Sequence, residues 1–243
     1  MLEIRVNQVR TNCDSRRAYD EIYSQSETDI ALRPSYYLWL IEQFKLRSND
    51  RYLDISCGHG QLTYLAQKCG LQSVGIDLSL VGLQAGRKEM GLLDLVSGNG
   101  QTLPFANGTF TIISNIGSLE HYVDMKTAIT EMARVLQPGG RAFVLVPNTF
   151  SLMHNIWIAF KEGRTNLDKQ PIQRYAARQE WEHLLQENGL HVEKTTKYEI
   201  ERPRTLDDWH SYARHPKRFV RLLLAPLVPL NLAFCFLFEC RKL

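Results

Sequence analysis

Short apolar runs alternate with amphipathic stretches through the middle of this chain. The apolar runs lie at residues 51–55, 74–77, 92–96, 110–114 and 141–146. Each run is short enough for a buried strand, and glycine-rich, polar or helix-patterned stretches separate it from the next. Strands that alternate with helices over short connections predict a mainly parallel sheet with helices on both faces. The pattern therefore predicts the α/β class.

Helical spacing marks the connecting segments. Leu62, Leu65, Ala66 and Cys69 share one face of a predicted helix that Gly70 ends. Met125, Ala128, Ile129, Met132 and Leu136 share a face of a second helix, which Asp124 caps and Pro138-Gly139-Gly140 ends. Toward the C-terminus we expect a helix over 179–186, a strand over 191–198 and a final strand over 232–242.

Composition narrows the class of protein. The chain has 243 residues, 44% hydrophobic and 23% charged, which is enough for one well-buried domain. Its net charge of +3 and its lack of Lys/Arg blocks interleaved with aromatics argue against nucleic-acid binding. The five cysteines form no C-x-x-C pair and no metal-ligand spacing. We therefore expect reduced thiols, no metal site and a cytoplasmic protein without a signal peptide.

A glycine loop follows the first predicted strand. It reads Asp54-Ile55-Ser56-Cys57-Gly58-His59-Gly60. Its glycines let the backbone turn tightly and bring N–H groups against a ligand, and the helix that follows points its positive end at an anionic group. Asp77 comes roughly twenty residues later, at the end of the second strand, where an acid accepts hydrogen bonds from a ribose diol. This unit predicts a nucleoside-containing cofactor.

The loop alone leaves two alternatives open, a nicotinamide-dependent oxidoreductase and a structural turn. Thr63 argues against the oxidoreductase, because a nicotinamide-binding loop needs Gly or Ala there. Two later motifs decide between the readings: Gly98-Asn99-Gly100-Gln101-Thr102-Leu103-Pro104-Phe105 and Val135-Leu136-Gln137-Pro138-Gly139-Gly140. In this order, over about Leu53 to Pro147, the motifs closely resemble the class I S-adenosylmethionine-dependent methyltransferases of the small-molecule type.

The resemblance implies a Rossmann-like, doubly wound, mainly parallel sheet of seven strands with an antiparallel last strand. It implies one domain over residues 1–243, with an N-terminal helical cap (1–50), a cofactor-binding core (51–147) and an acceptor-side insertion with closing strands (148–243). In such proteins the cap closes over the cofactor, which makes Tyr19 or Tyr23 a lid contact. The alternative, which we favour, is that the aromatic side chains of the cap only pack on the sheet.

The resemblance also implies a set of S-adenosylmethionine contacts: Asp54, Ser56, Cys57, Gly58, Gly60, Asp77, Leu78, Asn99, Gly100, Gln101 and Asn115. The loop is expected to hold the methionine end, Asp77 the ribose hydroxyls and Leu78 one face of the adenine. Asn99 stands where the family usually has Asp, and its oxygen can still accept from the adenine amino group. The N–H groups of Gly100 and Gln101 are expected to be available to a ring nitrogen. Ser56 and Thr111 depart from the Gly and Asp common at their positions.

Methyl transfer from a sulfonium needs little side-chain chemistry beyond positioning. A general base is needed only when the acceptor carries a proton that must leave. His121, in Ser118-Leu119-Glu120-His121-Tyr122, is the titratable side chain that the motif order places near the transferred methyl group. We therefore name His121 as the candidate catalytic residue; the alternative is that it hydrogen-bonds backbone or shapes the pocket.

An apolar stretch near the C-terminus has more than one interpretation. Residues 219–238 are mostly apolar, and basic residues precede and enter them, but Arg221, Pro226, Pro229 and Asn231 interrupt the stretch. A membrane span needs about 20 apolar residues, so we do not expect one. We favour a helix that leads into a buried strand at the edge of the sheet. The alternative is a basic and apolar surface that rests on anionic lipid and gives access to an isoprenoid or acyl acceptor.

The function that these features predict is transfer of a methyl group from S-adenosylmethionine to a small-molecule acceptor by in-line substitution. One alternative is a catalytically silent S-adenosylmethionine-binding protein, favoured if Asn99 and Thr111 reflect a degraded pocket. Another is a methyltransferase of a lipid or isoprenoid acceptor at the membrane surface. The identity of the acceptor, the atom that is methylated and the oligomeric state are left open by the sequence.

Overall fold

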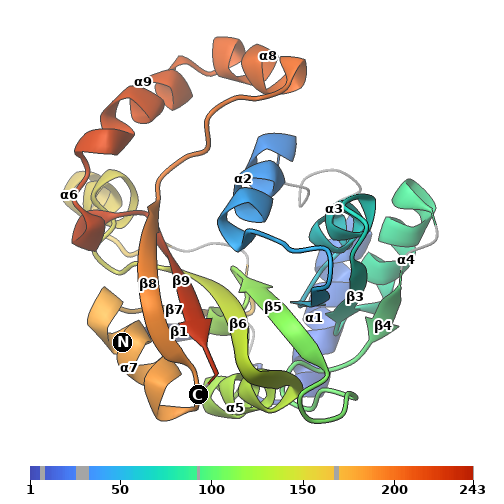
Figure 1. The fold of residues 1–243 in the computed structure, drawn as a ribbon. Helices are drawn as coiled ribbons and strands as arrows, with labels where there is room; N and C mark the ends of the chain where they lie inside the picture. The colour runs from blue at the N-terminus through green and yellow to red at the C-terminus, as the bar shows by residue number, and fades with distance from the viewer. Residues whose placement is uncertain (6–8, 26–32, 92–93, 167–169, 243) are drawn as a thin grey trace.

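A seven-stranded sheet forms the centre of the computed structural model, which describes residues 1–5, 9–25, 33–91, 94–166 and 170–242. The strands are β2 (Arg51–Ile55), β3 (Gln72–Asp77), β4 (Leu95–Ser97), β5 (Phe110–Ile116), β6 (Leu136–Pro147), β8 (His191–Tyr198) and β9 (Cys235–Arg241). They lie in the order β4-β3-β2-β5-β6-β9-β8. The pairs from β4 through β6 are parallel, whereas β9 is antiparallel to both β6 and β8 (Figure 1). The predicted sheet with its antiparallel last strand is confirmed.

Helices cover both faces of the sheet, and the alternation of side chains along each strand explains why. Tyr52 belongs to an apolar cluster with α2 (Pro34–Phe44) and α3 (Gln61–Lys68), and the next residue, Leu53, belongs to the cluster on the other face. That second cluster includes α5 (Met125–Val135) and α7 (Arg178–Glu187). Successive side chains of a strand point to opposite faces, so a strand buried on both faces is apolar throughout.

The N-terminal cap is not entirely helical. It contains α1 (Asn12–Gln25) and α2, but Leu2–Arg5 form β1, which pairs antiparallel with β7 (Ile172–Tyr175) in a separate two-stranded sheet. Arg174 of β7 forms an ion pair with Glu3, at 2.5 Å, and donates to the carbonyl oxygens of Glu120 and Tyr122. These contacts fasten the strand pair to the turn after β5, so this part of the predicted cap is corrected to a strand.

Two predicted boundaries also change. The strand expected over 92–96 is observed over Leu95–Ser97, and residues 92–93 lie outside the described residues. The helix expected to include Leu136 ends at Val135, because Leu136 pairs with Phe110 and already belongs to β6. Pro138-Gly139-Gly140 therefore lies inside the β6 segment rather than at the helix end.

The C-terminal part adds helices beyond the β8–β9 edge of the sheet (Figure 1). A short π-helical segment, η2 (Leu152–Ile156), leads into α6 (Trp157–Glu162); α8 (Leu206–Arg214), α9 (Pro216–Leu224), η3 (Ala225–Leu227) and η4 (Leu230–Leu232) precede β9. The remaining elements are α4 (Leu80–Met90) and η1 (Leu119–His121). The helix and buried strand expected after residue 219 are both present, but β9 lies between β6 and β8 rather than at the edge of the sheet as expected. Among the described residues no helix combines the length and apolar character needed to cross a membrane.

Candidate functional site

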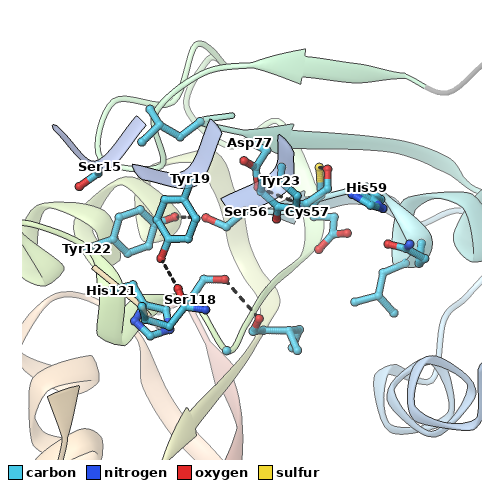
Figure 2. A pocket seen from close by; sticks show the side chains of 18 of the residues that line it. Ser15, Tyr19, Tyr23, Ser56, Cys57, His59, Asp77, Ser118, His121 and Tyr122 are labelled. Atoms are coloured by element: carbon cyan, nitrogen blue, oxygen red, sulfur yellow. Dashed lines mark hydrogen bonds between the residues drawn. The ribbon is translucent and has the colours of Figure 1, made fainter. Parts of the chain in front are cut away.

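A cavity of about 440 Å³ lies at the carboxyl ends of β2, β3 and β5, where a parallel sheet of this kind opens its ligand crevice. The glycine loop and Asp77 line it together with Tyr19 and Tyr23 of α1 (Figure 2). Helix α2 supplies two further tyrosines to the wall. Asp54, Ser56, Cys57, Gly58, Asp77, Leu78, Asn99 and His121 all line this cavity. The structure therefore brings together most of the residues that the sequence singled out.

The glycine loop turns through left-handed backbone conformations. Ser56 has φ +60°, Gly58 has φ +58° and Gly60 has φ +86°. Side chains with a Cβ disfavour this region, which explains why Gly is common at the position of Ser56. The hydroxyl of Ser56 hydrogen-bonds the hydroxyl of Tyr122 at 2.7 Å, and this contact offsets part of the conformational cost. The loop is also packed tightly from behind, because a Cβ on Gly86 of α4 would lie 1.9 Å from the carbonyl oxygen of His59.

Asp77 ends β3 and is oriented by two backbone groups. Its Oδ2 accepts from the Gly58 N–H and its Oδ1 accepts from the Ser79 N–H, each at 2.8 Å. Burial raises the pKa of this carboxyl, and the two N–H groups partly offset that rise. Since a carboxylate oxygen has two lone pairs, each oxygen keeps capacity for a further donor from a ligand.

Asp54 is a second buried carboxyl in the cavity wall, 3% exposed. It accepts from Ser114 Oγ at 2.9 Å and from Thr63 Oγ1 at 3.3 Å. Burial raises its pKa to about 6, and these hydroxyl donors limit the rise. The ionised form is therefore costly in the folded protein at neutral pH.

This raised pKa gives a stability prediction for Asp54→Asn. Well below about pH 4 the carboxyl is protonated in both states. As the pH rises from about 4 to 6, the unfolded chain ionises while the folded carboxyl stays protonated, which favours the unfolded state. The variant has no such carboxyl and avoids this loss of stability. Its free energy of unfolding is expected to exceed that of the original protein by an amount that grows by about 3 kcal/mol between pH 4 and pH 7.

Urea unfolding at a series of pH values measures this difference. Asp124→Asn is the matched control, because hydrogen bonds from Thr127 lower the pKa of Asp124 and its removal should produce a difference of opposite sign. A stability difference for Asp54→Asn that does not change with pH would contradict the assignment.

Some predicted cofactor residues do not reach the cavity. Four of them are not among the residues that line it: Gly60, Gly100, Gln101 and Asn115. The N–H of Gln101 donates to Asn99 Oδ1 at 2.9 Å, so it is not available to a ligand as expected. A Cβ on Gly100 would lie 2.1 Å from the Tyr122 hydroxyl oxygen, so this glycine allows Tyr122 to pack against the chain. Asn115 is fully buried, and its Nδ2 donates to the Ile55 carbonyl oxygen at 3.2 Å.

His121 lines the cavity from η1, and its Nδ1 lies 2.5 Å from the carbonyl oxygen of Ile172 in β7. Since a carbonyl oxygen only accepts, this contact requires the proton on Nδ1 and leaves Nε2 as the basic nitrogen of the neutral ring. Nε2 is 3.8 Å from Glu120 Oε1. The backbone contact that the sequence gave as an alternative is present, and its geometry also leaves a basic nitrogen in the ring.

Sequence reasoning did not assign several tyrosines of the wall: Tyr36, Tyr37 and Tyr122. Tyr19 and Tyr23, named only as lid contacts, line the cavity too (Figure 2). Tyr19 donates to Gln170 Oε1 at 3.0 Å, and a Cβ on Gly58 would lie 2.8 Å from the Tyr23 hydroxyl oxygen. The preferred interpretation that the cap aromatics only pack on the sheet is therefore wrong for α1 and for Tyr36 of α2, although it holds for Phe44.

Cys57 lines the cavity as well, and burial raises the pKa of its thiol well above the ordinary value. Its Sγ lies close behind β3, since a Cβ on Gly75 would be 2.8 Å from it. A small side chain is therefore needed at this place in the loop.

Comparison with known proteins agrees with this geometry. Residues 53–144, which run from the middle of β2 through β5 and into most of β6, match the methyltransferase domain family. The cofactor-binding core of the chain is thus that of a class I S-adenosylmethionine-dependent methyltransferase. This family uses S-adenosylmethionine as the methyl donor, which excludes the nicotinamide-dependent oxidoreductase.

Relatives of this chain share mainly the cofactor-binding core. A demethylmenaquinone methyltransferase of Corynebacterium kroppenstedtii is 37% identical over 98 residues, 40% of this chain and 42% of that protein. A probable chloroplastic tocopherol O-methyltransferase of Oryza sativa subsp. japonica is 38% identical over 100 residues, 38% of this chain and 28% of that protein. The matched part thus spans less than half the length of either relative.

A solved structure extends the likeness to the whole fold. It is a methyltransferase of Thermotoga maritima described as a possible histamine N-methyltransferase, with a TM-score of 0.67. It covers 94% of this chain and 100% of that chain, at 15% identity. At this identity the likeness supports the fold alone.

The cavity fits the cofactor of the matched domain family. A nucleoside requires an acid for the ribose hydroxyls, an apolar side chain against the base and a bare backbone near the charged end. Asp77, Leu78 and Gly58 supply these three in one wall. The contacts of individual residues with the cofactor remain predictions.

Proposed function

We propose that this methyltransferase transfers a methyl group from S-adenosylmethionine to a small lipid-like acceptor that binds in the same cavity. The observation that carries the proposal is the division of the cavity wall. The glycine loop and Asp77 form a polar part, whereas Tyr36, Tyr37 and Ile116 form a part suited to an apolar ligand. The names of the two relatives, which act on demethylmenaquinone and tocopherol, point to the same kind of acceptor.

We assign the cofactor contacts to the residues of the polar part. Asp77 would accept from the ribose hydroxyls, Leu78 would pack on the adenine and Asn99 would lie at the adenine edge. Asn99 keeps acceptor capacity after receiving the Gln101 N–H, since a carbonyl oxygen has two lone pairs. The glycine loop would hold the methionine end.

When bound, S-adenosylmethionine supplies a methyl group that is already electrophilic. The protein therefore has to hold the acceptor in line with it and keep water out. Orientation of this kind contributes on the order of 7 to 11 kcal/mol to barrier lowering. The hydrogen bond between Tyr19 and Gln170 joins α1 to the chain before β7 at the cavity, and this closure supports exclusion of water.

Labelled S-adenosylmethionine tests the proposal. The purified protein is incubated with the labelled donor and with cell extracts fractionated by polarity, and we expect label in a product from the apolar fractions. Calorimetry should show binding of S-adenosylmethionine and its demethylated product, and none of NAD(H) or NADP(H). Tight cofactor binding without transfer to any fraction would favour the silent binding protein.

His121→Gln is expected to lower kcat by about 10²-fold with little change in cofactor affinity, if the acceptor loses a proton during transfer. The neutral ring offers Nε2 as a base, whereas the amide of Gln does not accept a proton at neutral pH. His183→Gln is the matched control, because His183 lies on α7 with a side chain 73% exposed. Single-turnover rates with the acceptor found above measure the effect. A rate within threefold of the original would limit His121 to shaping the wall.

A further inference from the structure

Helix α9 turns its apolar side toward solvent. Phe219, Val220, Leu223 and Leu224 are 45%, 54%, 62% and 45% exposed. None of the nine residues of this helix is buried. A surface helix of a globular protein normally buries its apolar stripe and exposes the polar one. The orientation of α9 is the reverse, because its apolar side faces solvent. We therefore expect another surface to bind there and bury this side.

Polar contacts hold α9 in this orientation. The guanidinium of Arg221 lies 4.6 Å from the centre of the Phe234 ring and 3.8 Å from a carboxylate oxygen of Glu199, whose side chain is 4% exposed. Arg218 donates to Ser211 Oγ at 2.6 Å. Because its cationic side is bonded to the rest of the protein, the apolar side necessarily faces outward.

A second segment adds to this surface. Trp157 and Phe160 of α6 are 56% and 83% exposed, and their ring centres are 6.2 Å apart. The π-helical segment before α6 packs His154 on Phe234, the ring that also contacts Arg221, with ring centres 5.1 Å apart. Figure 1 shows α6 and α9 on the same side of the molecule. We call Trp157, Phe160, Phe219, Val220, Leu223, Leu224 and Leu227 the outer apolar face.

The charge around the outer apolar face indicates which kind of surface binds to it, a second copy of the chain or anionic lipid. Residues 209–230 contain Arg214, Lys217, Arg218 and Arg221 and no acidic residue. Arg214 and Lys217 are exposed. A second copy of the chain would bring these like charges together, whereas anionic lipid headgroups would neutralise them.

We propose that the outer apolar face docks on an anionic lipid bilayer, with α9 lying in the plane of the interface. An amphipathic helix with basic residues at the margin of an apolar face binds in this way. Trp157 suits such a position, because the indole ring is favoured at the membrane–water interface. The docking surface lies outside the cavity, so it is independent of the proposed methyl transfer.

Sedimentation with vesicles tests the proposal, without cofactor or acceptor. The full chain should bind vesicles of equal parts phosphatidylglycerol and phosphatidylcholine more tightly than vesicles of phosphatidylcholine alone. Leu223→Ser should weaken binding about tenfold or more, since the variant loses a leucine side chain that would be buried in the bilayer. Leu80→Ser is the matched control: Leu80 is 47% exposed on α4, on the opposite side of the molecule (Figure 1), and its loss should leave binding unchanged.

Charge variants separate the electrostatic part. Lys217→Ser should weaken binding to the anionic vesicles about fivefold and leave binding to phosphatidylcholine unchanged. Unfolding curves of the variants confirm that they fold. The proposal is overturned if the original protein does not bind anionic vesicles. It is equally overturned if Leu223→Ser and Leu80→Ser weaken binding alike, or if Leu223→Ser leaves lipid binding intact and instead dissociates a dimer seen by light scattering.

Discussion

Asp77→Ala is expected to weaken S-adenosylmethionine binding by about 10²- to 10⁴-fold. A carboxylate that accepts from two ribose hydroxyls makes two charge-assisted hydrogen bonds, each worth about 1.5 to 3 kcal/mol. The substitution has a second cost, because it removes the acceptor of the Gly58 and Ser79 N–H groups. The hydrogen bonds of these groups to Asp77 hold the loop in place. Calorimetric titration of S-adenosylmethionine into the variant measures the loss.

Two controls interpret this loss. Asn99→Ala should weaken binding less than Asp77→Ala, since a neutral amide contributes about 0.5 to 1.5 kcal/mol per hydrogen bond. Asp77→Asn keeps the shape of the side chain and removes its charge, so an intermediate loss is expected. Thermal unfolding separates damage to the loop from loss of contact. Equal losses at Asp77 and Asn99, or a larger loss at Asn99, would mean that the ribose contact is assigned to the wrong residue.

Deletion of residues 219–243 should leave a chain with no cooperative unfolding transition, recovered mainly as insoluble protein. This deletion removes β9, which pairs with β6 on one side and β8 on the other. Its loss exposes the edge of β6, leaves β8 without a partner strand and uncovers the apolar residues packed against Phe236 and Phe238. Circular dichroism during a urea titration is the measurement.

Two point variants test the contributions of β9 and α9 to stability separately. Phe238→Ala in β9 should lower the free energy of unfolding by about 3 to 5 kcal/mol, because the side chain is fully buried. Leu223→Ala in α9 should change it by less than about 0.5 kcal/mol, because this side chain is already exposed. A soluble truncated chain that unfolds cooperatively and binds cofactor would show that residues 219–243 are an appendage.

Local sequence patterns predicted the sheet and many of the residues that line the cavity. The apolar runs of strands buried on both faces identified β2, β3, β5 and half of β6, since such runs need no knowledge of their neighbours. Asp77 was found by its distance from the glycine loop along the chain. The family match to residues 53–144 then confirmed the class.

Contacts between distant segments were not accessible in this way. Pairing of Leu2–Arg5 with Ile172–Tyr175 joins strands about 170 residues apart, and nothing in either short segment names the other. The sequence predicted a helix after residue 219 but not the direction in which its apolar side points, which depends on contacts of Arg221 with Glu199 and Phe234. Likewise, the hydrogen-bond partner of Tyr19 at the cavity is Gln170, which lies in a segment without clear periodicity.

The half-buried thiol of Cys57 has a practical consequence for following motions of the protein. Only the thiolate reacts with maleimides, so the raised pKa of Cys57 protects the loop from alkylation near neutral pH. Cys13 on α1 and Cys69 at the end of α3 are exposed. Fluorophores can therefore be attached at these two positions without any substitution. Energy transfer between them would follow the movement of α1 relative to the sheet as ligands enter and leave.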